Sequence, residues 1–249
     1  MSCNQGSVRS QRQTPEGSDN MQINEKNIEI YGGKKRTIVL GNAEVKNGSV
    51  WNENMISPCF EKNQYGFKAL TVTIWMKGNS TKEIEKNISD LLANLIDVSI
   101  ISDPDLSHKF CGFLKKHSKK VLIENKNMIL TLEFSGYEFA ERTLTKTETQ
   151  SIEIDNDGNL LSPAVLEIVP KASGVLTVSG CTTEPFAIKN VVQGQKIKID
   201  GITGEMTADG ESKAADMEIW ELPYLFSGSN TISMNMQADI TVKYEARYF

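Results

Sequence analysis

The C-terminal end of the chain carries the clearest hydrophobic pattern. From residue 239 onward, polar residues alternate with apolar ones, which are Ile240, Val242, Tyr244, Ala246 and Tyr248. A period of two residues is typical of a β-strand with one buried and one solvated face. Just before it, Gly228 can adopt a positive φ and Asn230 can bond to its own main chain, so residues 227–230 favour a sharp turn. The pattern predicts a β-hairpin or strand pair at the C-terminus, anchored in a sheet.

In the first half of the chain, a strand pattern is followed by a helical pattern. Residues 68–76 are rich in β-branched side chains and predict a strand. After Gly78, apolar residues follow helical spacing at Ile84, Ile88, Leu91, Leu92 and Leu95. Ser80 and Glu83 form a capping box at the start of this helix. We expect the helix to cover one face of a sheet, whose further strands are predicted at residues 97–101, 109–116, 119–124 and 128–134.

The second half of the chain contains strand patterns and no helical pattern. Residues 141–150 are polar and rich in threonine, and we place the domain boundary there, with residues 143–150 as a linker. Short strands separated by turn signals are predicted at residues 152–155, 164–169, 175–179, 186–190, 196–200, 205–208, 231–236 and 240–249. This arrangement predicts a β-sandwich.

Segment 222–232, which reads LPYLFSGSNTI, resembles, together with the closing strand, the C-terminal motif of siphophage distal tail proteins. In that family an aromatic residue or leucine, a proline, a leucine and a Pro-Gly-x-Asn turn lead into two paired strands. Leu222 and Ser227 stand where the family most often has phenylalanine and proline. Residues 156–168 and 194–200 are similar to motifs of the family's galectin-like domain, and most of residues 21–140 is similar to its ring-forming first domain.

The resemblance implies a non-enzymatic structural protein of a virion tail. The implied fold is an α+β N-terminal domain, a β-sheet with one covering helix at residues 21–142, followed by an all-β galectin-like β-sandwich at residues 151–249. The N-terminal domains are expected to form a homohexameric ring around a channel through which the genome passes. The implied partners are the tail tube protein, the tail-associated or baseplate hub protein and a receptor-binding protein, with assembly in the host cytoplasm.

The composition is that of a folded chain long enough for two domains, with 249 residues, of which 39% are hydrophobic and 24% charged. A net charge of −5 gives no general attraction to nucleic acid or anionic membranes. No apolar run approaches the roughly 18 residues of a spanning helix, so we expect no membrane insertion. One basic run, residues 115–120, could contact a phosphate backbone, but we interpret it as the solvated tip of a hairpin.

The N-terminal 20 residues form a polar segment. After Met1 their one large apolar residue is Val8, so alone they are expected to be disordered unless a partner orders them. Met21 is an alternative start.

Residues that could carry catalysis or bind a metal or cofactor are few. The four cysteines, Cys3, Cys59, Cys111 and Cys181, include no Cys-x-x-Cys pair, so they predict neither a zinc site nor a disulfide framework. Buried free thiols are expected instead. His108 and His117 are the only histidines, and on a strand His108 and Cys111 would point to opposite faces. We therefore expect no catalytic set, no metal and no cofactor.

Three segments that could be mistaken for sites are predicted to be turns. Asp103-Pro104-Asp105 holds two carboxylates, but glycosidase carboxylates are placed about 5 to 10 Å apart across a cleft. Segment 155–158, DNDG, begins like a calcium loop, but its glycine comes early and Leu166 stands in place of the bidentate glutamate. The glycine-containing segment 201–210, which begins with Gly201-Ile202-Thr203-Gly204, lacks the Gly-Lys-Ser/Thr ending of a phosphate-binding loop, so a β-turn or loop is expected there.

The tryptophans leave an alternative function open. Trp51, Trp75 and Trp220 could form platforms for sugar rings, and Trp220 lies in the predicted sandwich, whose galectin-like architecture binds sugars in other proteins. The alternative is therefore a carbohydrate-binding adhesin module that recognises host cell-wall sugar. An exposed Trp220 above a groove would favour this function, whereas a Trp220 buried in the core would favour the scaffold.

Overall fold

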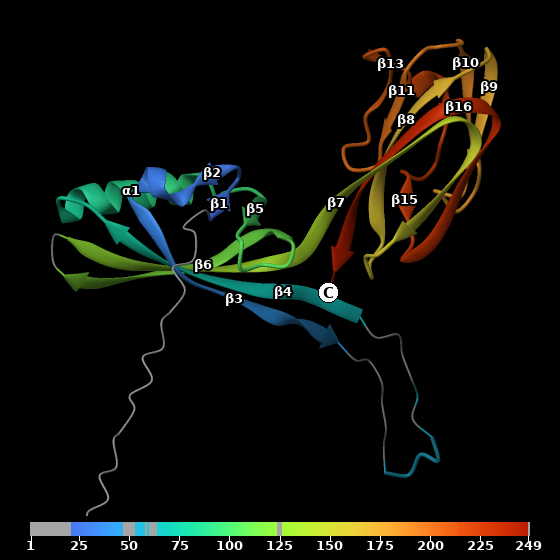
Figure 1. The fold of residues 1–249 in the computed structure, drawn as a ribbon. Coiled ribbons are helices and arrows are strands. Elements are labelled where there is room, and N and C mark those ends of the chain that lie inside the picture. The colour runs from blue at the N-terminus through green and yellow to red at the C-terminus, as the bar shows by residue number, and fades with distance from the viewer. Residues whose placement is uncertain (1–20, 47–52, 58, 60–63, 124–125, 249) are drawn as a thin grey trace, which may run out of the picture.

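The computed structural model describes residues 21–46, 53–57, 59, 64–123 and 126–248, and strands dominate it (Figure 1). The helices in these residues are η1 (Ile28–Tyr31), α1 (Thr81–Ala93) and η2 (Ala214–Asp216). The strands up to the middle of the chain are β1 (Gln22–Ile23), β2 (Lys26–Asn27), β3 (Gly33–Lys46), β4 (Gln64–Lys77), β5 (Ser99–Ser102), β6 (Lys109–Ile123) and β7 (Asn127–Asn156). Those that follow are β8 (Ser162–Pro170), β9 (Gly174–Ser179), β10 (Phe186–Val191), β11 (Ile197–Asp200), β12 (Met206–Ala208), β13 (Glu211–Ser212), β14 (Met217–Glu218), β15 (Tyr224–Leu225) and β16 (Gly228–Tyr248).

Helix α1 lies over one face of the sheet formed by β3, β4, β7 and β6 (Figure 1). Its N-cap is Ser80, whose Oγ accepts a hydrogen bond from the Glu83 N–H at 3.2 Å. The helix shares a hydrophobic core with alternate residues of β4 and β7; among its buried members are Ile84, Ile88, Leu91, Leu70, Val72, Ile74, Leu130 and Leu132. The predicted helix, its cap and its place over a sheet are confirmed.

Strand β7 connects the two halves of the molecule. Its first part lies between β4 and β6, with Lys68 opposite Gly136. From Glu138 onward β16 takes the place of β4 beside β7, with Tyr248 opposite Glu138, and follows it as far as Asn156. Residues 143–150, expected to form a linker, are instead part of this strand. Threonine favours strands, and a solvated strand tolerates the polar sequence that we interpreted as a boundary.

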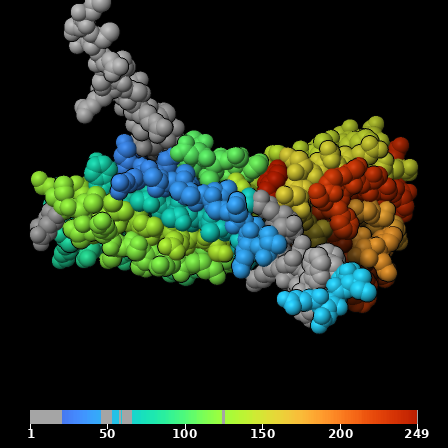
Figure 2. All heavy atoms as spheres, turned by 90° about the horizontal axis from the view of Figure 1, so that it is seen from below, coloured from blue at the N-terminus to red at the C-terminus, as the bar shows by residue number. Residues whose placement is uncertain are grey.

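The strands after residue 151 surround a second hydrophobic core. They form two groups that share β7 and β16. In one group, β8 pairs with the last part of β16 and is followed across the sheet by β11, β12 and β13. In the other group, β9 pairs with β16 at Ser233 and Met234 and is followed by β10 and β14. Both groups contribute to this core, for example with Leu166, Val178 and Ile188. Figure 2 shows the two halves as adjoining lobes, blue to green and yellow to red.

The alternation at the C-terminus is confirmed, but the predicted hairpin is wrong. Ile240, Val242 and Ala246 are fully buried. The two predicted strands, however, are one strand, β16, which pairs with β7 and not with itself. Its register shifts after Ser233, and residues 234–237 contain no glycine or proline that would reverse the chain.

The turn that leads into β16 is present as predicted. Gly228 has a φ of 82°, and the Asn230 Oδ1 accepts a hydrogen bond from the Phe226 N–H at 2.8 Å. The Asn230 Nδ2 donates to the carbonyls of Phe226 and Gly228. The Asn230 side chain therefore holds the turn by bonding to the main chain of Phe226 and Gly228.

Two further differences concern the first sheet. The strands predicted at residues 109–116 and 119–124 are one strand, β6, so the basic run at residues 115–120 is exposed along a strand and is not a hairpin tip. Strand β3 was not predicted, because its glycine and polar residues weaken the period of two. Among the described residues, β3 pairs only with β4, and it is therefore an edge of the sheet.

Candidate functional site

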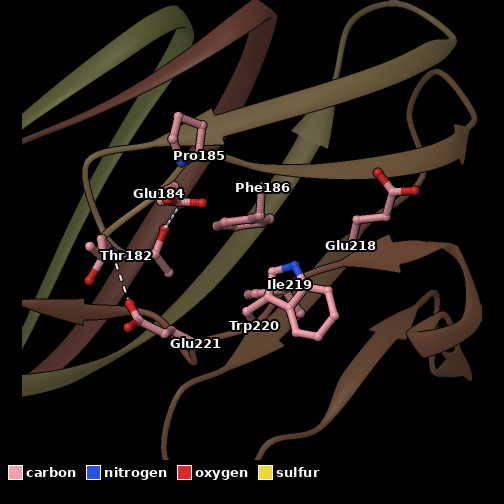
Figure 3. A pocket seen from close by; sticks show the side chains of 9 residues that line it. Thr182, Glu184, Pro185, Phe186, Glu218, Ile219, Trp220 and Glu221 are labelled. Carbon is pink, nitrogen blue, oxygen red and sulfur yellow. Dashed lines mark hydrogen bonds between the residues drawn. The ribbon is translucent and has the colours of Figure 1, made fainter.

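A pocket of about 200 Å³ opens at one end of the β10–β14 pair (Figure 3). Its lining comes from two segments, residues 182–186 and residues 218–221. The two strands are antiparallel, with Ala187 opposite Glu218, so the residues before β10 and the residues after β14 meet at the same end. Segments distant in sequence thereby form one site.

Trp220 lies at this pocket with 96% of its surface exposed. The neighbouring residue, Ile219, packs against the second core, and Phe186 is buried where β10 begins. Such exposure leaves the face of the indole free to contact a ligand. The exposure that would favour carbohydrate binding is present.

Backbone contacts hold the two lining segments together. The Thr183 N–H donates to the Glu221 Oε2 at 3.0 Å, and the Tyr224 N–H donates to the Cys181 carbonyl at 2.9 Å. The first of these bonds lowers the pKa of the Glu221 carboxyl. The pocket is therefore shaped before any ligand arrives.

The pocket is acidic. Its lining includes Glu184, Glu218 and Glu221 and no lysine, arginine or histidine. Glu218 pairs with Lys189 outside the pocket. The Glu184 carboxylate makes no hydrogen bond or ion pair within the described part of the chain, so it is available to a ligand. Such a site can stack a ligand on the indole and accept hydrogen bonds from it.

The Asp103-Pro104-Asp105 carboxylates serve a turn and an ion-pair cluster. The Lys35 Nζ lies 2.8 Å from the Asp103 Oδ1 and 2.7 Å from the Asp105 Oδ2. The Asp105 N–H donates to the Asp103 Oδ1 at 2.8 Å, which closes the predicted turn. Both carboxylates are paired with one lysine, an arrangement that differs from two acids facing each other across a cleft.

Of the other two predicted turns, the one at residues 155–158 is only partly present, because Asp155 and Asn156 belong to β7 and the connection to β8 begins at Asp157. Asp157 pairs with the Arg142 Nη2 at 2.7 Å, which lowers the pKa of Asp157. The Asp200 Oδ1 accepts hydrogen bonds from the backbone of Ile202 and Thr203, which shapes segment 201–204. The described residues contain no cluster of three or more groups suited to a metal.

His108 and Cys111 are not brought together as a catalytic pair. The His108 ring stacks on Tyr248, with centroids 4.0 Å apart. Cys111 lies beside Tyr137, and burial raises the pKa of both groups. Arg247 lies over the Tyr137 ring at 4.5 Å. The contacts of Tyr248 and Arg247 attach the end of β16 to the first sheet, and the sequence carries no signal for them because they join residues over 100 positions apart.

The remaining candidates are placed as follows. Trp75 is partly exposed on β4, with the Lys77 Nζ 4.5 Å from its ring, while Trp51 and Cys3 lie outside the described residues. Cys181 is buried as expected, but Cys59 is exposed, and the described cysteines are free thiols. Within the described part of the chain, no helix has the length and apolar character needed to cross a membrane.

No family model and no curated protein matches this sequence. The fold, in contrast, is that of phage tail hub and baseplate proteins. The crystal structure of the SPP1 Dit protein, described as a hub of the adsorption apparatus in phages that infect Gram-positive bacteria, has a TM-score of 0.71 at 10% identity, over 92% of this chain and 99% of that chain. A chain of the phage P2 baseplate in its activated conformation has a TM-score of 0.58 at 9% identity, over 88% of this chain and 92% of that chain. The resemblance to distal tail proteins predicted from the closing motif is confirmed at the level of the fold.

Proposed function

We propose that this protein is a non-enzymatic hub of a phage tail, or of a related tail-like particle, that joins the tail tube to the adhesion apparatus at the tail tip. The observation that carries the proposal is the fold shared with the SPP1 Dit protein over nearly the whole length of both chains. The closing turn at Gly228 and Asn230 is an independent match from the sequence.

A homohexameric ring is consistent with the edges of the first sheet. In the described residues, β3 pairs only with β4, and the part of β6 after Gly112 pairs only with β7. Unpaired strand edges are templates for pairing with another chain. The order β3, β4, β7, β6 is antiparallel throughout, so β3 of one copy and β6 of the next would also meet antiparallel. Contact between two different edges is head to tail, and such contacts form a ring when the rotation from one copy to the next closes.

The partners of such a ring follow from the role. One face would contact the tail tube protein and the other the tail-associated or baseplate hub protein, with the genome passing through the channel. The second half, which we propose to be a galectin-like sandwich, would project outward to contact a receptor-binding protein. The protein would thus be located in the virion tail after assembly in the host cytoplasm.

The test of the ring is the native mass of the purified protein, measured by light scattering, with an edge variant. Val39 lies on the edge strand β3 with 59% of its surface exposed, and a lysine on an edge strand opposes pairing with another strand. We expect a hexamer for the wild type and loss of the hexamer for Val39→Lys. The control is Val175→Lys on β9, at 49% exposure in the other half, which should keep the wild-type mass. A folded, strictly monomeric wild type, or a Val39→Lys variant that still forms the hexamer, would contradict edge pairing.

A second candidate function, carbohydrate binding, is favoured by Trp220. Its exposed indole at a pocket is the feature that separates this function from a pure scaffold. The test is retention of isolated host cell-wall polysaccharide, which Trp220→Ala should abolish without changing the native mass. Equal retention by the variant and the wild type would remove this candidate and leave the hub untouched.

A further inference from the structure

The Trp220 pocket is rich in hydrogen-bond acceptors, and the one lining side-chain donor that makes no hydrogen bond within the described residues is the Trp220 indole N–H. Its three carboxylates can only accept hydrogen bonds when ionised. The hydroxyl groups are already engaged, since the Thr182 Oγ1 donates to the Glu184 carbonyl at 2.6 Å and the Thr183 Oγ1 lies 3.3 Å from the Tyr224 hydroxyl. The best ligand is therefore one that brings several donors.

The negative charge of the pocket further limits the class of ligand that it can bind. Lys189, which pairs with Glu218, does not line the pocket, so the field at Glu184 and Glu221 is negative. An anionic ligand such as a phosphorylated sugar would meet like charges without a compensating cation. A positively charged nitrogen would gain from the carboxylates and from the face of the indole, the aromatic ring with the strongest attraction for cations.

We propose that the Trp220 pocket selects a sugar that carries a free amino group. The indole stacks on the sugar ring, and the Glu184 and Glu221 carboxylates bind the ammonium group. The volume of about 200 Å³ suits one or two sugar rings and not a long polymer, so the pocket would read a terminal or exposed residue of a polysaccharide. This inference rests on the carbohydrate function proposed above and specifies its ligand class.

Isothermal titration of the full-length protein at low salt and mildly acidic pH tests the proposal. The probes are the fully deacetylated glucosamine trimer, its N-acetylated form and glucose 6-phosphate. We expect the deacetylated trimer to bind about tenfold more tightly than the N-acetylated trimer, which corresponds to about 1.4 kcal/mol, and the phosphate to show no binding. Trp220→Ala should abolish binding of both trimers.

The substitution Glu184→Gln tests the contribution of the Glu184 charge to amine selection, because it removes the charge and keeps a side chain of similar size. Because this carboxylate makes no hydrogen bond or ion pair within the described part of the chain, the substitution should leave folding intact, remove most of the preference for the amine and retain binding of the N-acetylated trimer. Glu153→Gln, an exposed glutamate on β7, makes the same charge change and should preserve the preference. If wild type binds both trimers equally, the selection for an amine is wrong and carbohydrate binding stands.

Two further outcomes distinguish failure of the carbohydrate function from failure of the amino-sugar proposal. If neither trimer binds, the carbohydrate function itself is wrong. If trilysine binds more tightly than the deacetylated trimer and loses affinity in Glu184→Gln, the pocket serves a basic segment of a protein partner, and the sugar proposal is overturned. A native mass measured on each variant keeps these results independent of ring formation.

Discussion

Ile240 allows a direct test of how the second core is built. This residue lies on β16 opposite Lys146 of β7 and Ile168 of β8, and its side chain is fully buried. Replacing it with alanine removes three carbon groups, each contributing about 0.8 kcal/mol when buried, or about 2.4 kcal/mol together. The cavity that remains adds to this, so we expect a loss of about 2 to 5 kcal/mol.

That loss is large against the total stability of a domain, which is about 5 to 15 kcal/mol. Native-state hydrogen exchange is the suitable assay, because it reports the opening of each half separately. In Ile240→Ala, amides of β8, β10 and β16 should lose protection, while those around α1 and β4 should keep it, since their core contains no residue of β16. Ile202→Ala, at a position with 52% exposure in the same half, is the control and should change stability by less than about 0.5 kcal/mol.

Two results would refute this reasoning. An effect of Ile240→Ala no larger than that of Ile202→Ala would mean that the site relaxes without a cavity. Equal loss of protection around α1 would mean that the two cores unfold as one unit through β7.

Three further predictions concern polar contacts. Glu167 lies between Lys196 at 2.8 Å and Lys243 at 2.6 Å, and these partners lower its pKa from its ordinary value of 4.5. The stability that Glu167 contributes is therefore present above that pH and is lost as the pH falls through the lowered pKa. In urea unfolding, Glu167→Gln should be less stable than wild type at neutral pH and equal to it in strong acid. Asp103→Asn should destabilise the first half by about 1 to 3 kcal/mol in urea unfolding, because the Asp103 side chain is fully buried against Lys35. Asp105→Asn, at 61% side-chain exposure, should change stability by less than about 0.5 kcal/mol in the same assay. Equal effects of the two variants would contradict the view that only the buried carboxylate stabilises the fold. Asn230→Ala removes three hydrogen bonds from the turn before β16, where Asn230 is only 6% exposed. The substitution should lower the free energy of unfolding by about 1 to 3 kcal/mol, measured by thermal unfolding. An unchanged melting temperature would show that the turn does not need these hydrogen bonds.

Local patterns predicted local features well. The helix followed from its spacing and from Ser80, and the buried face of the closing strand followed from alternation. The turn at Gly228 followed from the freedom of glycine and from the ability of Asn230 to bond to nearby main chain, and the turn at residues 103–105 followed from its Asp-Pro-Asp sequence. Each of these features depends on residues within a few positions of one another, which is the range in which sequence periodicity carries information.

Features that depend on distant partners were missed. The polar segment 143–150 is a strand because β16, almost 100 residues later, pairs with it. Strand β6 continues through a run of lysines because β7 supplies the partner backbone. The Trp220 pocket exists because β10 and β14 bring two loops to one end. None of these pairings leaves a periodic signal in the residues concerned, so the structure was needed to find them.

Strand β7 matters for the proposed role because it is a continuous element where a linker was expected. Its backbone is bonded to β4 as far as Gly136, to β6 as far as Phe139 and to β16 from Glu138 onward, so the second half is attached to the first by a sheet and not by a free segment. Gly112 and Gly136 face each other at this exchange, and a Cβ on Gly136 would lie 1.9 Å from the Cys111 carbonyl oxygen. Only glycine permits that approach. In a ring built on the first sheet, each outward domain would therefore hold a defined direction, as a hub that presents several copies of one adhesion part requires.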